Sequence, residues 1–546
     1  MKKRITSLLL VLAICFAMLP TAAFAAEDEE STMPAYSGGS GTQDNPWRIS
    51  SVEDLQLLAN TINDGKAAGF DADAAAGGAG VAGNYYGYYF KQTTDLDLRS
   101  IENWAPIGYS GGCYFAGHYD GDGHTITGAK STGKVDERDK DDADSYGCAT
   151  AGIFGWVAFG SVKNLTVKNA DFLATGNNNF GYAGGVLAVA YSCTVENCSV
   201  YNSKIESRRD PNENSNYAGG ITGIALDSSF EKCASVENTI RHGSFGGDFI
   251  GSLDNGDSNF TNCYVVNCIV TGCSDTASNS TLSGGFLGAS MDGDAILNSC
   301  FVYDCVAQPD TTSKGEDYFA IFTPNTQYGK VVAKSHVYYY DANNAKVNAD
   351  GAESKTSEEF TDGTVANLLG EAFAQGKLYP VFATDSADYS DVDIAIAKAN
   401  ALNKDNYKDF SVVEAAVNAV VRDKKIAEQP AVDAMAKAIE DAIAALQYKD
   451  ADYTKVDAAI AKANALNKDN YKDFSAVEGA VNAVARGKNI TEQTDVDAMA
   501  KAIEDAIAAL QYKGADYTKV DEALAKANTL NKNSYQDFSA CGKGHC

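Results

Sequence analysis

The hydrophobic pattern between Ala151 and Ala307 repeats. Five strand-like runs carry apolar residues at matching positions: Val162–Phe172, Val195–Ile205, Phe230–Ile240, Phe260–Val270 and Leu297–Ala307. Aligned, they form four columns, which are Val162/Val195/Phe230/Phe260/Leu297, Leu165/Cys198/Cys233/Cys263/Cys300, Val167/Val200/Ser235/Val265/Val302 and Ala170/Ser203/Asn238/Cys268/Cys305. Columns of like residues at repeat spacing predict a solenoid in which each coil buries its apolar face against the next.

Helical patterns stand on both sides of these runs. Ser51–Asp54 has the form of a capping box, and Leu55, Leu58, Ala59 and Ile62 follow at helical spacing. We expect this helix to cover the first coil, which would otherwise be exposed. A second helical pattern lies within residues 356–380 around Val365, Leu368 and Leu369, and we expect it to close the far end.

Glycine-rich phrases accompany the repeated runs. They lie in Tyr114–Gly128 and at Ala151-Gly-Ile-Phe-Gly155, Ala183-Gly-Gly-Val186, Ala218-Gly-Gly-Ile221 and Ser283-Gly-Gly-Phe-Leu-Gly288. Together these phrases resemble the GLUG-type repeats of bacterial surface proteins, over roughly residues 41–382. The resemblance implies a right-handed parallel β-helix. We expect the glycines to supply the positive φ and missing Cβ that tight turns between sheets need.

A different period begins at Asp388. Tyr389, Tyr453 and Tyr517 recur every 64 residues. Each complete unit has the pattern of three amphipathic helices. In the second unit, the first helix contains Val456–Leu466, the second begins at a capping box, Ser475–Glu478, and the third begins at Thr494-Asp495. Three such helices predict a small three-helix bundle. The units resemble FIVAR modules, which occur as arrays in large exported bacterial proteins and serve as stalks or as binders of cell-wall, glycan or matrix ligands.

The predicted organisation is therefore multidomain, a right-handed parallel β-helix followed by an α-helical array of three-helix bundles. The third 64-residue unit follows its siblings only to Ala540, and Cys541–Cys546 depart from the pattern. We expect a truncation or frameshift there, because a single helix cannot bury its apolar face. The predicted segments are a signal peptide (1–25), a flexible acidic and Gly/Ser-rich lead-in (26–40), the capped β-helix (41–385), FIVAR-like modules (388–449 and 452–513) and a partial third module with an aberrant tail (516–546).

The first residues have the features of an export signal. Lys2, Lys3 and Arg4 precede an apolar core at Leu8–Leu19, and Ala23-Phe-Ala25 fits a cleavage site, so we expect the mature chain to begin at Ala26. No second apolar run long enough to span a membrane follows, so no membrane insertion is expected after cleavage. The 73 acidic and 44 basic residues give a net charge of −29, which argues against nucleic acid and anionic membranes as partners.

Cysteines are concentrated in the repeated columns. Of 13 in the chain, ten lie between Cys113 and Cys305. We favour buried thiols, since Cys behaves as a small hydrophobe in a stack. Cross-coil disulfides are an alternative, because neighbouring coils about 4.8 Å apart bring Cys198, Cys233, Cys263 and Cys300 within range. Zinc binding by these cysteines is a third hypothesis. The Cys-x4-Cys spacing lacks the close pairs of structural zinc sites, and on a straight strand it points the two thiols to opposite faces.

Two catalytic motifs are missing from the sequence. Immunoglobulin-cleaving metallopeptidases related to GLUG-repeat proteins need His-Glu-x-x-His, but none of the five histidines, His118, His124, His242, His336 and His545, is followed by Glu. There is no P-loop. Carboxylates that a polysaccharide lyase or hydrolase could use are Asp95 with Asp97, and Asp120 with Asp122. Asp120–Gly123 reads more readily as a turn, with His124 structural, and Asp136–Asp144 as a solvated loop. Cys541, His545 and Cys546 are a weak metal set.

Tyrosines are dense at two places, Tyr85–Tyr89 and Tyr338–Tyr340, where they either pack within the strands or form a surface that stacks sugars. We predict an exported bacterial cell-surface protein that binds a glycan, cell-wall or host-matrix polymer through the β-helix, with the helical modules as a stalk. We predict no catalytic, cofactor-binding or metal-binding residues and no cofactor, and the sequence does not single out the ligand-binding residues. The alternatives are a carbohydrate-active β-helix enzyme (a polysaccharide lyase or hydrolase) and a purely structural stalk of a larger protein.

Overall fold

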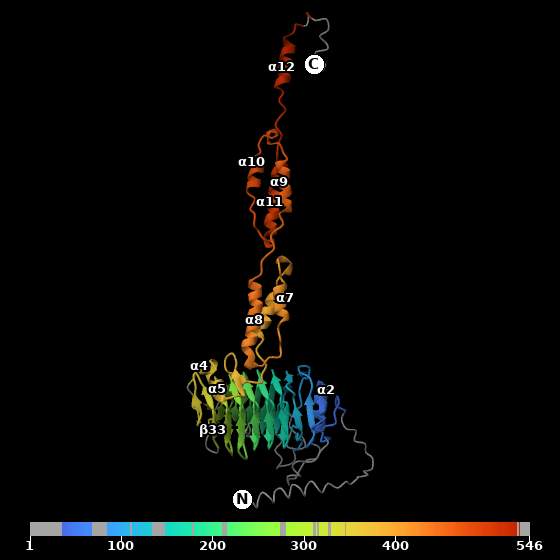
Figure 1. Cartoon of the computed structure of the whole chain (residues 1–546). Helices are drawn as coiled ribbons and strands as arrows, with labels where there is room; N and C mark the ends of the chain where they lie inside the picture. Colours follow the sequence, from blue (N-terminus) through green and yellow to red (C-terminus); the bar gives the residue numbers. More distant parts are fainter. Residues whose placement is uncertain are drawn as a thin grey trace, which may run out of the picture. The chain divides into compact units, whose positions relative to one another are not determined.

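The computed structural model describes residues 35–67, 84–109, 112–133, 148–176, 180–209, 216–273, 280–308, 313, 316–325, 329–343, 345–531 and 534. The chain divides after Asp385 into two compact units. In the first, short strands of successive coils pair in parallel and stack into a β-helix (Figure 1). The second is helical. The predicted order, a parallel solenoid followed by a helical region, is confirmed.

Five sheets run along the β-helix, and we number them in the order in which a coil visits them. Sheet 1 has ten described strands: β1 (Trp47–Ile49), β2 (Tyr89–Gln92), β4 (His118–Asp120), β9 (Ser161–Lys163), β14 (Thr194–Glu196), β19 (Ser229–Glu231), β24 (Ser258–Thr261), β29 (Ala295–Asn298), β33 (Val331–Ser335) and β35 (Ala349–Asp350). Sheet 2 has nine: β3 (Leu96–Asp97), β5 (Thr125–Thr127), β10 (Thr166–Lys168), β15 (Ser199–Tyr201), β20 (Ala234–Val236), β25 (Tyr264–Val266), β30 (Phe301–Tyr303), β34 (Tyr338–Tyr340) and β36 (Glu353–Ser354).

The other three sheets complete each coil. Within the described residues, sheet 3 contains β6 (Lys130–Ser131), β11 (Asp171–Gly176), β16 (Lys204–Arg209), β21 (Thr239–His242), β26 (Ile269–Gly272) and β31 (Val306–Ala307). Sheet 4 contains β7 (Ala149–Ala151), β12 (Gly181–Gly184), β17 (Asn216–Gly219), β22 (Phe245–Gly247), β27 (Thr281–Gly284) and β32 (Asp317–Ala320). Sheet 5 contains β8 (Phe154–Ala158), β13 (Leu187–Tyr191), β18 (Thr222–Leu226), β23 (Ile250–Leu253) and β28 (Leu287–Ser290).

The residue columns read from the sequence are in register. Val162 pairs with Val195, which pairs with Phe230, and Val167 pairs with Val200 in the same way. The side chains of these columns are buried in one apolar core that runs through the β-helix. Each coil therefore supplies one layer of that core, as a solenoid requires.

The cysteine column is a stack of buried thiols. Seven cysteines are free thiols, and all seven are buried: Cys193, Cys198, Cys233, Cys263, Cys268, Cys300 and Cys305. Each column thiol donates to the carbonyl two residues before it in its own coil; Cys198 to Glu196 O (3.3 Å) and Cys300 to Asn298 O (3.2 Å) are examples. The structure thus agrees with buried thiols rather than cross-coil disulfides. Cys263 and Cys268 both reach the interior, because the chain bends between them at Asn267, whose φ is 51°.

The glycine phrases confirm the expected need for a missing Cβ but, at most of their positions, not the expected positive φ. Positive φ at the corners between sheets 1, 2 and 3 belongs mostly to other residues, chiefly Asn, which tolerates this conformation; examples are Asn164, Asn197 and Asn202. Gly184 and Gly219 do not have positive φ. They are needed because a Cβ would lie 2.0 Å from Leu187 O or 1.9 Å from Thr222 O. At these corners the chain folds back so tightly that backbone occupies the space of a side chain.

Helix α2 (Val52–Asn63) covers the first coil, as predicted (Figure 1). Ser51 Oγ accepts from Asp54 N at 3.2 Å, so Ser51 is the N-cap. The Asp54 carboxylate accepts from Ser50 N (2.8 Å) rather than closing the box on Ser51. Leu55, Leu58 and Ile62 are fully buried in the core of the β-helix.

The segment after the last coil does not simply close the far end, as we expected. It comprises α4 (Ser357–Thr361), α5 (Thr364–Leu369) and an antiparallel pair, β37 (Phe373–Gln375) and β38 (Pro380–Phe382). Its apolar residues pack against the outward side chains of sheet 2, including Tyr264, Val266 and Phe301. These outward positions are apolar and need a cover, so the segment lies along a side of the β-helix. We call residues 357–382 the lateral segment.

The helical unit repeats one arrangement. Helices α6 (Ser390–Asn400), α7 (Ser411–Asn418) and α8 (Gln429–Ala444) share one apolar core, and α9 (Thr454–Asn464), α10 (Ser475–Asn482) and α11 (Gln493–Ala508) share another. Helix α12 (Thr518–Thr529) follows, and the 3₁₀ turns are η2 (Lys404–Asn406), η3 (Ile426–Glu428), η4 (Lys468–Asn470) and η5 (Ile490–Glu492). Across the described residues, no helix combines the length and apolarity needed to cross a bilayer.

Two predicted helix starts in the second module are wrong. Ser475 is not an N-cap: it is the first residue of α10, and its N–H donates to Asp473 Oδ1 at 2.8 Å. Helix α11 begins at Gln493, directly after η5, whose Asn489 and Glu492 form a capping box. In both places a polar side chain further upstream accepts from one backbone N–H, Asp473 from Ser475 and Asn489 from Thr491.

Candidate functional site

A hollow lies on the outer face of sheet 1 near its first strands. Strands β2, β4 and β9 are neighbours, so Tyr89, His118 and Ser161 form one outward column, while Lys91, Asp120 and Lys163 form the next. The residues between these columns point inward: Phe90, Tyr119 and Val162 are buried in the core. The alternation of each strand thus places two polar or aromatic columns side by side on the surface.

A turn from the start of the β-helix forms the opposite wall. Asn45 N donates to Thr42 O at 3.1 Å, which holds Gln43 and Asp44 in a tight loop before β1. The space between the loop and the two columns is about 460 Å³ and is lined by Gln43, Asp44, Pro46, Tyr89, Phe90, Lys91, His118, Asp120, Ser161 and Lys163. This volume is within the range of small-molecule sites.

Tyr89 and His118 form an aromatic platform. Their ring centroids are 4.5 Å apart with an interplanar angle of 27°. Ser161 Oγ lies 2.9 Å from His118 Nδ1 and fixes the orientation of the imidazole. Burial, and then the charge of Lys163, lower the pKa of His118, so the ring is neutral at neutral pH.

Asp120 supplies a fixed negative charge beside the platform. Its carboxylate accepts from Asn164 Nδ2 (2.8 Å) and Asp122 N (2.9 Å), and Lys163 Nζ lies at 3.3 Å. Burial raises the pKa of Asp120, but these hydrogen bonds and the Lys163 ammonium bring it below its ordinary value. The group is therefore an ionised hydrogen-bond acceptor at neutral pH.

This combination suits a polyhydroxylated ring. Aromatic faces take up the C–H face of a sugar, while a carboxylate and ammonium groups meet its hydroxyls. A glycosidase needs a carboxylic acid with a raised pKa, and the lowered pKa of Asp120 does not fit that role.

The other predicted carboxylates are occupied elsewhere. Asp95 accepts from Thr125 N (2.8 Å) and contacts His124 Nδ1 (3.2 Å), so His124 has a structural partner. Asp97 pairs with Arg99, which lowers the pKa of Asp97 to about 2. Asp122 has a φ of 51° and belongs to the predicted turn; its carboxylate lies 3.0 Å from Lys91 Nζ. Of the four carboxylates, Asp120 lines the hollow.

The two tyrosine clusters divide between packing and surface. Tyr85 is buried in the core and Tyr88 stacks on Trp47 at 5.0 Å. Tyr89 lines the hollow and Tyr86 is 38% exposed. In the other cluster Tyr338 is buried beneath the lateral segment, and Tyr340 stacks on Tyr303. Packing therefore accounts for the second cluster, and one residue of the first belongs to the candidate site.

The sequence alone did not predict this site. His118 was noted only as one of the histidines, Asp120 as part of a turn and Tyr89 as one of a cluster. The contact between Tyr89 and His118 depends on the pairing of β2 with β4. Residues 1–34, Asp136–Asp144, Cys541, His545 and Cys546 lie outside the described residues. Where the structure describes the chain, no group of three or more His, Cys, Asp or Glu side chains is arranged to hold a metal ion.

No protein-family model matches the chain. Over 168 residues it is 27% identical to halomucin of Haloquadratum walsbyi, which covers 30% of this chain. The chain spans about 2% of the length of that relative. Among solved structures it is similar to a candidate immunoglobulin A1 protease from Bacteroides ovatus, with a TM-score of 0.41 and 17% identity, covering 65% of this chain and 99% of the other.

Proposed function

We propose that the chain is an exported bacterial cell-surface protein whose β-helix binds a glycan or a glycan-bearing cell-wall or matrix polymer. The single observation that carries the proposal is the hollow on sheet 1, in which the Tyr89–His118 platform stands beside the ionised Asp120. Binding is favoured over hydrolysis, because Asp120 lacks the raised pKa of a general acid.

The remaining parts of the chain have supporting roles in this proposal. The β-helix is right-handed and GLUG-like, in keeping with the usual hand of parallel crossover connections. The helical unit is an array of FIVAR-like three-helix bundles that acts as a spacer. The basic and apolar start of the chain directs export to the cell surface.

The test uses the chain lacking residues 1–25. The chain is first screened on a polysaccharide array, and its binding to each polymer that gives a signal is then measured by calorimetric titration. Tyr89→Ala is expected to weaken binding about fivefold, since an aromatic contact contributes on the order of 1 kcal/mol. Tyr86→Ala, which removes an exposed ring that does not line the hollow, is the matched control. Equal binding by wild type and Tyr89→Ala would remove the hollow as the site.

A further inference from the structure

The outer face of sheet 3 has a charge opposite to that of the whole chain. Its described outward residues fall into register columns, with Lys130, Asp171 and Lys204 in one and Leu173, Glu206, Arg241 and Thr271 in the next. Arg208 lies beside them on β16. Four cations thus meet two carboxylates on one face of a chain whose net charge is −29. We call Lys130, Lys204, Arg208 and Arg241 the basic face.

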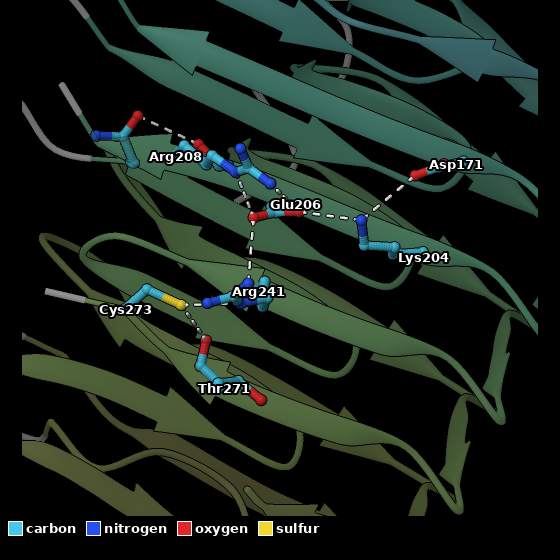
Figure 2. A network of polar contacts seen from close by, with 9 residues as sticks. Asp171, Lys204, Glu206, Arg208, Arg241, Thr271 and Cys273 are labelled. Atoms are coloured by element: carbon cyan, nitrogen blue, oxygen red, sulfur yellow. Dashed lines mark hydrogen bonds and ion pairs between the residues drawn. The ribbon is translucent and has the colours of Figure 1, made fainter. Parts of the chain in front are cut away.

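Glu206 organises the basic face. Figure 2 shows its carboxylate between Lys204, Arg208 and Arg241. Arg208 Nε lies 2.7 Å from Oε1 and its Nη2 3.4 Å from Oε2, Lys204 Nζ lies 3.3 Å from Oε2, and Arg241 Nη1 lies 3.8 Å from Oε1. Glu206 is only 2% exposed, whereas Lys204 and Arg208 keep 49% and 56% of their side chains exposed.

The geometry gives fixed cations whose side chains remain partly exposed. Arg241 is tied on its other side, where Nε lies 3.0 Å from Cys273 Sγ (Figure 2). Asp171 is a weak competitor, at 3.8 Å from Lys204 and half-exposed. Because a buried carboxylate already holds three cations in place, these side chains lose less conformational entropy when they bind an anion.

We propose that the basic face binds the acidic groups, carboxylate or sulfate, of an acidic polysaccharide. Guanidinium groups match both anions through paired hydrogen bonds. Separate acidic groups on a sugar polymer suit a small patch on an otherwise acidic protein. The dense phosphates of a nucleic acid would instead meet repulsion from the rest of the chain. This proposal goes beyond the hollow on sheet 1 and does not rest on it.

The test uses the chain lacking residues 1–25 and four probes: polygalacturonate, dextran sulfate, neutral dextran and duplex DNA. Wild type is expected to bind at least one acidic polysaccharide, more weakly as salt rises, and to leave dextran unbound. The double variant Lys204→Gln with Arg208→Gln is expected to bind about tenfold more weakly. The matched control removes two exposed lysines of the helical unit, Lys398→Gln with Lys437→Gln, and is expected to stay within about twofold.

Two further variants complete the experiment. If the double variant does not fold, Lys130→Gln replaces it, because Lys130 is exposed and has no contact with Glu206 among the described ion pairs. Its affinity for the acidic polysaccharide is expected to fall about two- to threefold, on the order expected for one exposed charge. Tyr89→Ala is expected to leave acidic-polymer binding unchanged, and loss in that variant alone would assign the polymer to the hollow. The proposal is wrong if the basic-face variants bind like the control, if dextran binds equally well, or if DNA binds as tightly as dextran sulfate at the same salt.

Discussion

Asp248 stands where neighbouring coils have glycine. Register places it between Gly220 and Gly285, and its side chain is fully buried. Within the described residues neither carboxyl oxygen has a hydrogen-bond partner. Burial is the main cause that raises the pKa of Asp248 well above its ordinary value. The folded state therefore keeps this proton in a pH range where the unfolded chain has lost it.

The sign of the pH effect follows. Below the unfolded pKa of about 4 both states are protonated, so the titration of Asp248 does not change the stability there. As pH rises from there to the folded pKa, stability falls by about 1.4 kcal/mol per pH unit, and the loss persists at higher pH. Asp248→Asn removes this titration, so we expect it to be more stable than wild type at pH 8 and to lose that advantage at pH 4.

Urea unfolding at pH 4, 6 and 8 measures the effect, with Asp292→Asn, an exposed carboxyl, as the control. An advantage of Asp248→Asn that is the same at all three pH values would contradict the assignment of a buried neutral carboxyl.

Glu206 is equally hidden but is expected to respond in the opposite direction. Burial raises the pKa of Glu206, yet the hydrogen bond and charge of Arg208, followed by Lys204, bring it below its ordinary value. Its contribution is therefore present above the unfolded pKa and is lost as pH falls through the folded pKa. We expect Glu206→Gln to lower the free energy of unfolding by roughly 1–3 kcal/mol at pH 7, and by less at pH 3.

The comparison is with Glu231→Gln, whose side chain is about half exposed and 3.7 Å from Lys232. That control is expected to change stability by less than about 0.5 kcal/mol. If both glutamine variants lose the same amount, the buried position of Glu206 has no special importance for stability.

Among the elements, the lateral segment depends on a few buried side chains. Leu369 at the end of α5 is 4% exposed and packs in the cluster that covers sheet 2, whereas its neighbour Leu368 is 39% exposed. We expect Leu369→Ala to cost about 2–5 kcal/mol and Leu368→Ala less than about 0.5 kcal/mol. Urea unfolding of residues 35–385 checks both variants, and equal losses would show that the segment does not pack on the β-helix.

The same segment shows where sequence reasoning reached its limit. The inward columns were predictable, because Val162, Val195 and their equivalents recur at a fixed position in each repeat. The outward cover was not, although a signal existed: Tyr264-Val-Val266 is apolar without alternation, which is typical of a strand buried on both faces. The strand-like runs were interpreted only as repeats, so no segment was predicted to cover their outward apolar side chains.

The candidate site was less predictable for a different reason. Its platform joins Tyr89 to His118 across two coils, and strand register, which depends on the irregular chain between them, decides which outward residues meet. The tight corners posed a similar problem, since sequence shows that Gly219 is glycine but not that Thr222 O occupies the place of its Cβ. Contacts between coils require the coil path, which residue types alone do not provide.

At the scale of the whole molecule, the described apolar clusters each lie on one side of Asp385. The clusters of the β-helix end at Phe382, and those of the helical unit begin at Ala387. A unit that has its own apolar cores can unfold by itself, so we expect the two units to unfold independently. We expect the calorimetric trace of the chain lacking residues 1–25 to equal the sum of those of residues 35–385 and 386–531, with each midpoint within about 2 °C of its value in the whole chain. A single merged transition, or a large fall in one midpoint on separation, would show that the units stabilise each other and would argue against the helical array as a simple spacer.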